Sequence, residues 1–146
     1  MMKRSFNENR YIISIDGIQI IDGDTDTINL STIGTYRREG RKYVISYEES
    51  EATGMPGNTT FLTADGNRCV TMTRKGPESS QLIIELGKKH MCHYETGYGP
   101  LAIGVYTESI TNKLSPSGGE LHVRYRLDIN STSLVTNELK ITVKEK

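Results

Sequence analysis

Tryptophan is absent from this chain of 146 residues, and cysteine is scarce. The two cysteines, Cys69 and Cys92, are expected to be free thiols, since disulfides are rare in reducing compartments. Long apolar runs are missing too, and no stretch approaches the ~20 consecutive apolar residues of a membrane-spanning helix. The basic residues near the N-terminus are not followed by the apolar segment of a signal peptide. These absences predict a cytoplasmic protein that does not associate with a membrane.

An excess of charge of one sign is also missing, because 18 Lys and Arg residues balance 18 Asp and Glu residues. Proteins that bind nucleic acids carry a basic excess or a concentrated basic surface. Here the basic residues form only short clusters, such as Arg37 with Arg38 and Arg124 with Arg126. Tyr125 lies between the second pair but in the apolar phase of its strand, so it is expected in the core. We therefore do not expect nucleic acid as a partner.

No segment has helical periodicity, and apolar and polar residues alternate along most of the chain instead. The pattern is clearest near the C-terminus, where Leu121, Val123 and Tyr125 share one face. Turn sequences such as Asp65-Gly66 separate the segments, which is typical of antiparallel hairpins. The sequence predicts an all-β, antiparallel meander of about eight to ten strands that closes into a barrel, because closure removes exposed edges.

Three features refine this prediction. Residues 1–9 are polar and expected to be a flexible N-terminus, followed by a single β-barrel domain over residues 10–146. Glycines inside strands, at positions 17, 34 and 104, suit the bends of a barrel, and a bulge or bend is expected at Asp16-Gly17. An immunoglobulin-like sandwich is the alternative, and the lack of tryptophan weighs against it.

Two stretches carry a resemblance to a known family. Residues 47–55, Tyr-Glu-Glu-Ser-Glu-Ala-Thr-Gly-Met, and residues 93–99, His-Tyr-Glu-Thr-Gly-Tyr-Gly, resemble the signature stretches of the YwiB-like bacterial proteins. The resemblance extends over roughly residues 10–145. It implies a bacterial protein with a calycin-like barrel, the group that includes lipocalins. The family's function is unknown, so the resemblance supplies no catalytic or binding residues.

The residues themselves point to one end of the barrel as a site. Glu49 is in phase with the apolar face of its strand, and Arg74 is in phase with Val70 and Met72. A buried charge is costly unless it is paired, so we expect Glu49 (or Glu51) to pair with Arg74. The leading hypothesis is a barrel that binds a small, partly polar ligand at this end. The predicted site residues are Glu49, Glu51, Thr53, Met55, Arg74, His93, Glu95 and Tyr98.

Two other functions stay open. The first is an enzyme that uses Glu49 or Glu51 with His93 and Glu95 for acid–base chemistry, although no known catalytic motif is present. The second is a filled barrel that acts on a protein partner through its outer surface. Metal binding is not expected, because the spacing of His90, Cys92 and His93 does not suit zinc. Asp22-Gly23-Asp24 begins like a calcium loop but lacks the later ligands, so a hairpin turn is expected there. No cofactor is expected.

Overall fold

The computed structural model describes residues 11–51, 56–77, 79–96, 99–129 and 133–146, with the backbone alone for residues 93–96, 99–100 and 133. Ten strands form, and each matches an alternating stretch of the sequence. In chain order they are β1 (Tyr11–Ile21), β2 (Asp24–Glu39), β3 (Lys42–Glu48), β4 (Thr59–Asp65), β5 (Cys69–Lys75), β6 (Ser80–Glu85), β7 (Lys89–Thr96), β8 (Gly99–Ser115), β9 (Gly118–Ile129) and β10 (Ser133–Glu145).

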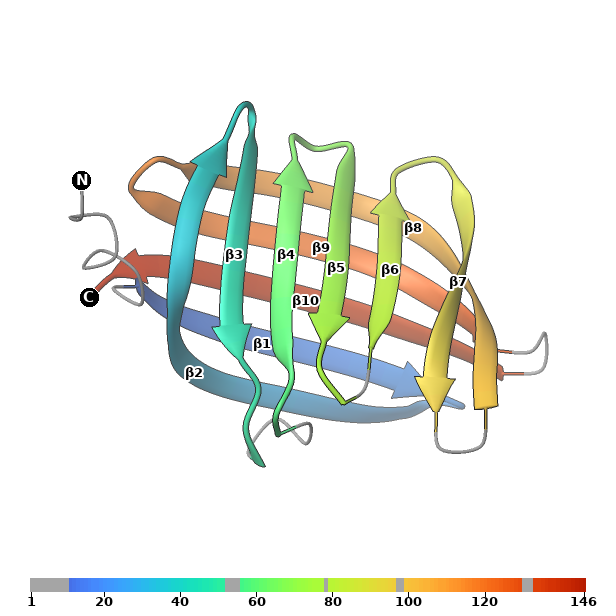
Figure 1. Ribbon diagram of the computed structural model, residues 1–146. Helices are drawn as coiled ribbons and strands as arrows, with labels where there is room; N and C mark the ends of the chain where they lie inside the picture. The colour runs from blue at the N-terminus through green and yellow to red at the C-terminus, as the bar shows by residue number, and fades with distance from the viewer. Residues whose placement is uncertain (1–10, 52–55, 78, 97–98, 130–132) are drawn as a thin grey trace.

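The strands form a closed antiparallel barrel in which each pairs with its neighbours in sequence and β1 also pairs with β10. Figure 1 shows the short strands β3 to β7 upright at the front and the long strands β1, β8, β9 and β10 crossing behind them. The predicted all-β, antiparallel meander of eight to ten strands is confirmed. The part of the chain that the structure describes contains no helix able to span a membrane.

Gly34 is the point at which β2 passes from the rear wall to the front wall. It pairs with Tyr11 at the end of the β1–β2 ladder and with Tyr47 at the start of the β2–β3 ladder. A Cβ atom on Gly34 would lie 2.2 Å from the Ser46 carbonyl oxygen and 2.6 Å from Cδ1 of Ile13. Only glycine permits this close approach, so the sharp change in the direction of β2 depends on it. The first part of β2 runs along the bottom of the barrel, near the lower ends of the front strands, before the strand turns upward (Figure 1).

Of the bulge or bend predicted at Asp16-Gly17, the bulge does not form. Strand β1 keeps an unbroken register through both residues with β10 and β2. Gly17 instead makes room for its neighbours, since a Cβ there would lie 3.2 Å from Cδ2 of Leu139. The register shift lies between Thr107 and Ser109, in the ladder of β8 with β9.

The turns follow the chemistry of their residues. Asp22 and Gly23 both have positive φ, 51° and 83°, and join β1 to β2 directly. This pair of angles is typical of the two-residue turn that matches the twist of antiparallel strands, and Asp-Gly favours it. The hairpin turn predicted at Asp22-Gly23-Asp24 is therefore confirmed.

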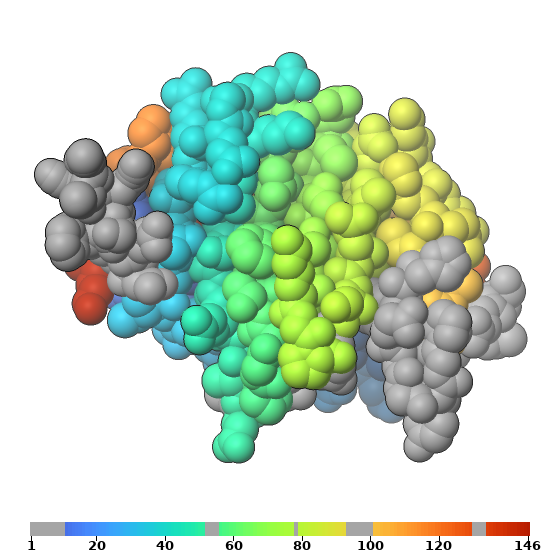
Figure 2. All heavy atoms as spheres, viewed as in Figure 1, coloured from blue at the N-terminus to red at the C-terminus, as the bar shows by residue number. Residues whose placement is uncertain are grey.

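Inward-facing side chains from both walls fill the middle of the barrel. The front wall contributes Ile45, Leu62 and Ile84, and the rear wall contributes Ile13 and Leu121, all at most 2% exposed. Burial of apolar surface is the main favourable term in folding, and contact between the walls makes one continuous core. Figure 2 shows the side chains of β3, β4 and β5 covering the front. Any site must therefore lie at an end of the barrel or on its outside.

Candidate functional site at the lower end

The lower end of the barrel, where β3 and β5 finish in Figure 1, holds a cluster of inward-facing polar residues. The register aligns Tyr47 of β3 with Thr60 of β4, and Thr60 with Arg74 of β5. Glu49 follows directly after β3, and its backbone N–H donates to the Asn58 carbonyl at 2.8 Å. This bond extends the β3–β4 pairing past the end of the strand and keeps the Glu49 side chain on the inner side.

Glu49 and Arg74 form a buried ion pair, as predicted. Nη2 of Arg74 lies 3.7 Å from Oε2 of Glu49, and the two side chains are 14% and 3% exposed. The hydroxyl of Thr60 donates to the same carboxylate oxygen. A carboxylate buried to this degree needs an opposite charge and hydrogen-bond donors, and the cluster supplies both.

Tyr47 completes the cluster. Burial raises its pKa to about 12, and the Glu49 carboxylate adds to this increase. The Arg74 guanidinium and a hydrogen bond with Thr60 oppose the increase only in part. Tyr47 is therefore a neutral phenol over the physiological range and can serve as a hydrogen-bond donor to the carboxylate.

Two loops pack against each other at the same end. Asn58 is 1% exposed, and a Cβ on Gly76 would lie 2.5 Å from its Oδ1 atom. Gly76 also has φ +141°, a conformation that side-chain-bearing residues rarely adopt. The sequence prediction missed Tyr47, Asn58 and Thr60 as site residues. The signal for Tyr47 and Thr60 was their inward phase on strands next to a charged residue in the same phase.

The predicted site residues have different outcomes. Glu49 and Arg74 come together, whereas Glu51 lies beyond the end of β3 and is exposed. His93 and Glu95 belong to β7, where their backbones pair with Ala102 and Pro100, and their side chains lie outside the described part of the chain. Three further predicted residues also lie outside the described residues: Thr53, Met55 and Tyr98.

A hollow of 160 Å³ is lined by residues of β1, β2 and β10, and we call it the lower hollow because β1 and β2 run along the bottom of the barrel in Figure 1. Its lining includes the inward-phase residues Gln19, Asp26, Ile28, Asn137 and Leu139, from β1, β2 and β10. Ile28 is 48% exposed although it faces inward. It is exposed because the long strands β1 and β2 continue past the apolar core that both walls share.

Asn137 is the buried polar residue of this hollow. Its side chain is 8% exposed, and its Oδ1 atom accepts a hydrogen bond of 3.3 Å from Nε2 of Gln19. Its Nδ2 atom is buried and has no hydrogen-bond partner among the residues that the structure describes. Asn137 is two residues before Leu139, in the phase of the predicted strand, so its inward position could have been found from the sequence.

Among the residues that the structure describes, the histidine, cysteine, aspartate and glutamate side chains form no cluster that could hold a metal ion. Cys92 is buried and Cys69 is half-buried, and both are free, as predicted. Burial raises the pKa of the Cys69 thiol, which lowers its reactivity at neutral pH.

Comparisons with known proteins agree with this architecture. The profile of the family "Domain of unknown function (DUF1934)" matches residues 13–141. The crystal structure of the ywiB protein from Bacillus subtilis is similar, with a TM-score of 0.81 and 19% sequence identity over 99% of each chain. At this identity the likeness establishes the fold alone. A search of curated proteins gives no match.

Proposed function

Because this chain belongs to the DUF1934 family, a bacterial family of unknown function, we infer its function from its own geometry. We propose that it binds a small, partly polar molecule at the lower end of the barrel. The ligand would have a short apolar body and an oxygen atom that accepts hydrogen bonds. The lower hollow would hold it, between the rear wall and the lower ends of the front strands. The cytoplasm is the compartment in which we expect this binding.

The observation that carries this proposal is the amide of Asn137. A buried donor without a partner costs about 1–3 kcal/mol, so it is seldom kept without a use. The Nδ2 atom of Asn137 is such a donor within the described part of the chain, and Asn137 is one of the residues that line the lower hollow. A ligand oxygen that accepted its hydrogen bond would remove the cost.

A second unused donor supports the same ligand chemistry. Nε of Arg74 is buried and has no hydrogen-bond partner in the described part of the chain, although Nη2 of the same guanidinium is paired with Glu49. Arg74 belongs to β5 in the front wall, and Asn137 belongs to β10 in the rear wall. Since both unused groups are donors, a carbonyl or carboxylate oxygen suits this end better than an amine.

The apolar part of the ligand follows from the rest of the lining. Ile28 and Leu139 provide apolar contacts, and their neighbour Gln19 provides a polar edge. Pockets with an apolar wall and a few placed polar groups are typical of small-molecule sites. The volume of 160 Å³ limits the bound part of the ligand to a few carbon atoms. Binding of a small ligand at one end of the barrel is also what the predicted likeness to calycins implies.

The proposal can be tested by calorimetric titration with hexanoate and hexanamide, with hexylamine as the comparison compound. We expect the two oxygen-bearing compounds to bind and the amine to bind at least about tenfold more weakly, because it offers no acceptor. The variant Asn137→Leu should lose binding. The control variant Asn29→Ala, an exposed asparagine on the outer face of β2, should keep it. Equal binding of hexylamine, or unchanged binding by Asn137→Leu, would overturn the proposal.

A further inference from the structure

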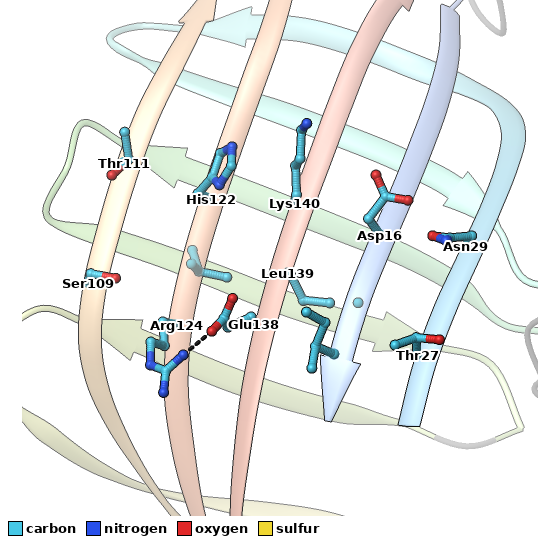
Figure 3. A pocket seen from close by; sticks show the side chains of 13 residues that line it. Asp16, Thr27, Asn29, Ser109, Thr111, His122, Arg124, Glu138, Leu139 and Lys140 are labelled. Carbon is cyan, nitrogen blue, oxygen red and sulfur yellow. Dashed lines mark hydrogen bonds and ion pairs between the residues drawn. The ribbon is translucent and has the colours of Figure 1, made fainter. Parts of the chain in front are cut away.

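A second hollow, of 570 Å³, lies on the outside of the barrel, and its lining shares Gly17, Ile18, Thr27 and Leu139 with that of the lower hollow. It extends over the five long strands β8, β9, β10, β1 and β2, and we call it the outer hollow. Its side chains come mostly from the outward phase of these strands and are polar or charged (Figure 3). A hollow of this volume on a sheet face is large enough for a small metabolite.

The register brings one row of polar side chains across all five strands. Thr111 of β8 pairs with His122 of β9, and His122 pairs with Lys140 of β10. Lys140 pairs with Asp16 of β1, and Asp16 pairs with Asn29 of β2. Figure 3 shows these five residues following one another across the sheet. Side chains directly opposite on neighbouring strands are close enough to contact one ligand together.

Several polar groups in the outer hollow already have partners. The guanidinium of Arg124 is paired with Glu138 and also donates to Glu108 at 2.7 Å. Asp16 accepts a hydrogen bond of 2.7 Å from the Asn29 amide, with that amide oriented to donate. His122 lies 3.4 Å from a carboxylate oxygen of Glu120.

Lys140 differs from these residues. It is half-buried in the outer hollow, and its ammonium group has no ion pair or hydrogen bond to any residue that the structure describes. Asp16 is directly opposite it and Glu138 is two residues away, yet neither comes within ion-pair distance. An unpaired ammonium beside an imidazole and a threonine hydroxyl is a good environment for an oxyanion.

We propose that the outer hollow binds the oxyanion of a small hydroxylated molecule, such as a sugar-like phosphate or carboxylate, with Lys140 as the charged anchor. His122 and Thr111 lie on one side of Lys140 and would donate to the anion. Asn29 and Thr27, on the far side, would contact the hydroxyl groups of the same molecule.

The acidic residues of the outer hollow limit how large a bound anion can be. Asp16 and Glu138 flank Lys140, and a polyanion lying across the sheet would meet both. Nucleic acids are therefore disfavoured, because binding them requires a continuous basic surface. A single compact anionic group can contact Lys140, while the hydroxyl groups of the same molecule donate hydrogen bonds to the two carboxylates.

The test is a two-dimensional amide NMR titration of the intact protein with glycerol 3-phosphate and with inorganic phosphate. We expect saturable shifts at the amides of Lys140, His122 and Thr111, and tighter binding of glycerol 3-phosphate than of phosphate. Lys140→Gln should weaken binding at least about tenfold, the effect of losing a charged hydrogen bond. Lys140→Arg should retain it.

Lys144 offers a matched control, because it lies on the outer face of the same strand, is exposed and is outside the hollow. Lys144→Gln should bind as the wild type does, and the spectra show directly whether each variant is folded. Absence of saturable shifts with both compounds, or equal weakening in Lys144→Gln, would overturn the proposed site. Equal affinity for both compounds would overturn its hydroxyl part.

Discussion

Arg74 lies across β4 from Glu49, and the two side chains meet inside the barrel with Nη2 of Arg74 3.7 Å from Oε2 of Glu49. The strand between them contributes the hydroxyl of Thr60 to the same carboxylate. Three successive strands of the front wall thus converge on one buried charge. This arrangement organises the polar lower end of the barrel, and several measurable consequences follow from it.

Removing one partner of this pair should destabilise the protein strongly. Arg74→Met leaves the Glu49 carboxylate buried without its counter-charge, so we expect a loss of about 3 kcal/mol in the free energy of unfolding. Glu49→Gln combined with Arg74→Met should recover part of that loss, because no unpaired charge remains. Urea unfolding of the three variants measures both effects.

An exposed ion pair provides the comparison for that experiment. The side chains of Arg37 and Glu39 are 51% and 55% exposed. Arg37→Met should therefore change the free energy of unfolding by less than about 0.5 kcal/mol. If Arg74→Met lowers the free energy of unfolding as little as Arg37→Met does, the Glu49–Arg74 pair does not organise the lower end of the barrel.

Tyr47 should make the stability of the barrel depend on pH in the alkaline range. Its pKa is raised from 10.0 to about 12, so the folded state favours the neutral phenol. This contribution is fully present below about pH 10 and is lost as the pH rises toward 12. The free energy of unfolding should fall less steeply over this range in Tyr47→Phe than in the wild type.

Denaturant unfolding at several pH values between about 9 and 12 tests this. Tyr36 also has a raised pKa, caused mainly by burial, but it is present in both proteins, so their difference isolates Tyr47. Parallel pH profiles for the wild type and Tyr47→Phe would show that folding does not raise the pKa of Tyr47 above its value in the unfolded chain.

Gly34→Ala should prevent β2 from crossing from the rear wall to the front wall. The added Cβ would lie 2.2 Å from a backbone oxygen, which cannot move without breaking the β2–β3 ladder. We expect a loss of about 3 kcal/mol in stability or failure to fold. In Gly17→Ala the nearest atom is the flexible end of Leu139 at 3.2 Å, so thermal unfolding should change little. Equal melting temperatures for the two variants would contradict this role of Gly34.

Asn137→Leu should separate stability from binding. The substitution removes a buried amide donor that has no partner among the described residues, and with it the 3.3 Å bond that Oδ1 accepts from Gln19, and it introduces an apolar side chain of similar size. We therefore expect the free energy of unfolding to stay the same or to rise by about 1 kcal/mol. A strong loss of stability by thermal unfolding would mean that the amide supports the fold, which would weaken its assignment to a ligand.

The sequence contains enough to predict much of the fold. Alternation places Leu121, Val123 and Tyr125 on one face, and all three are buried. The same phase rule predicts the pairing of Glu49 with Arg74, because inward positions on strands two apart can face each other. These predictions succeed because a side-chain period of two leaves few choices for each strand.

The lower hollow could not be predicted in the same way. Ile28 has the phase of a core residue, yet it is exposed because of how far β2 extends past the front strands. That offset depends on the tilt of the strands and on the crossing at Gly34, which arise only when the barrel closes. The outer hollow likewise depends on the register of five strands, which no single segment of the sequence contains.

The most direct test of the central claim, ligand binding at the lower end, is the side-chain amide resonance of Asn137 in a nitrogen–proton correlation spectrum during titration with hexanamide. Its absence from the spectrum of Asn137→Leu assigns the signal. We predict a saturable downfield shift of its proton as Nδ2 gains an acceptor. A resonance that stays unchanged up to saturating concentrations of hexanamide would contradict the proposed site.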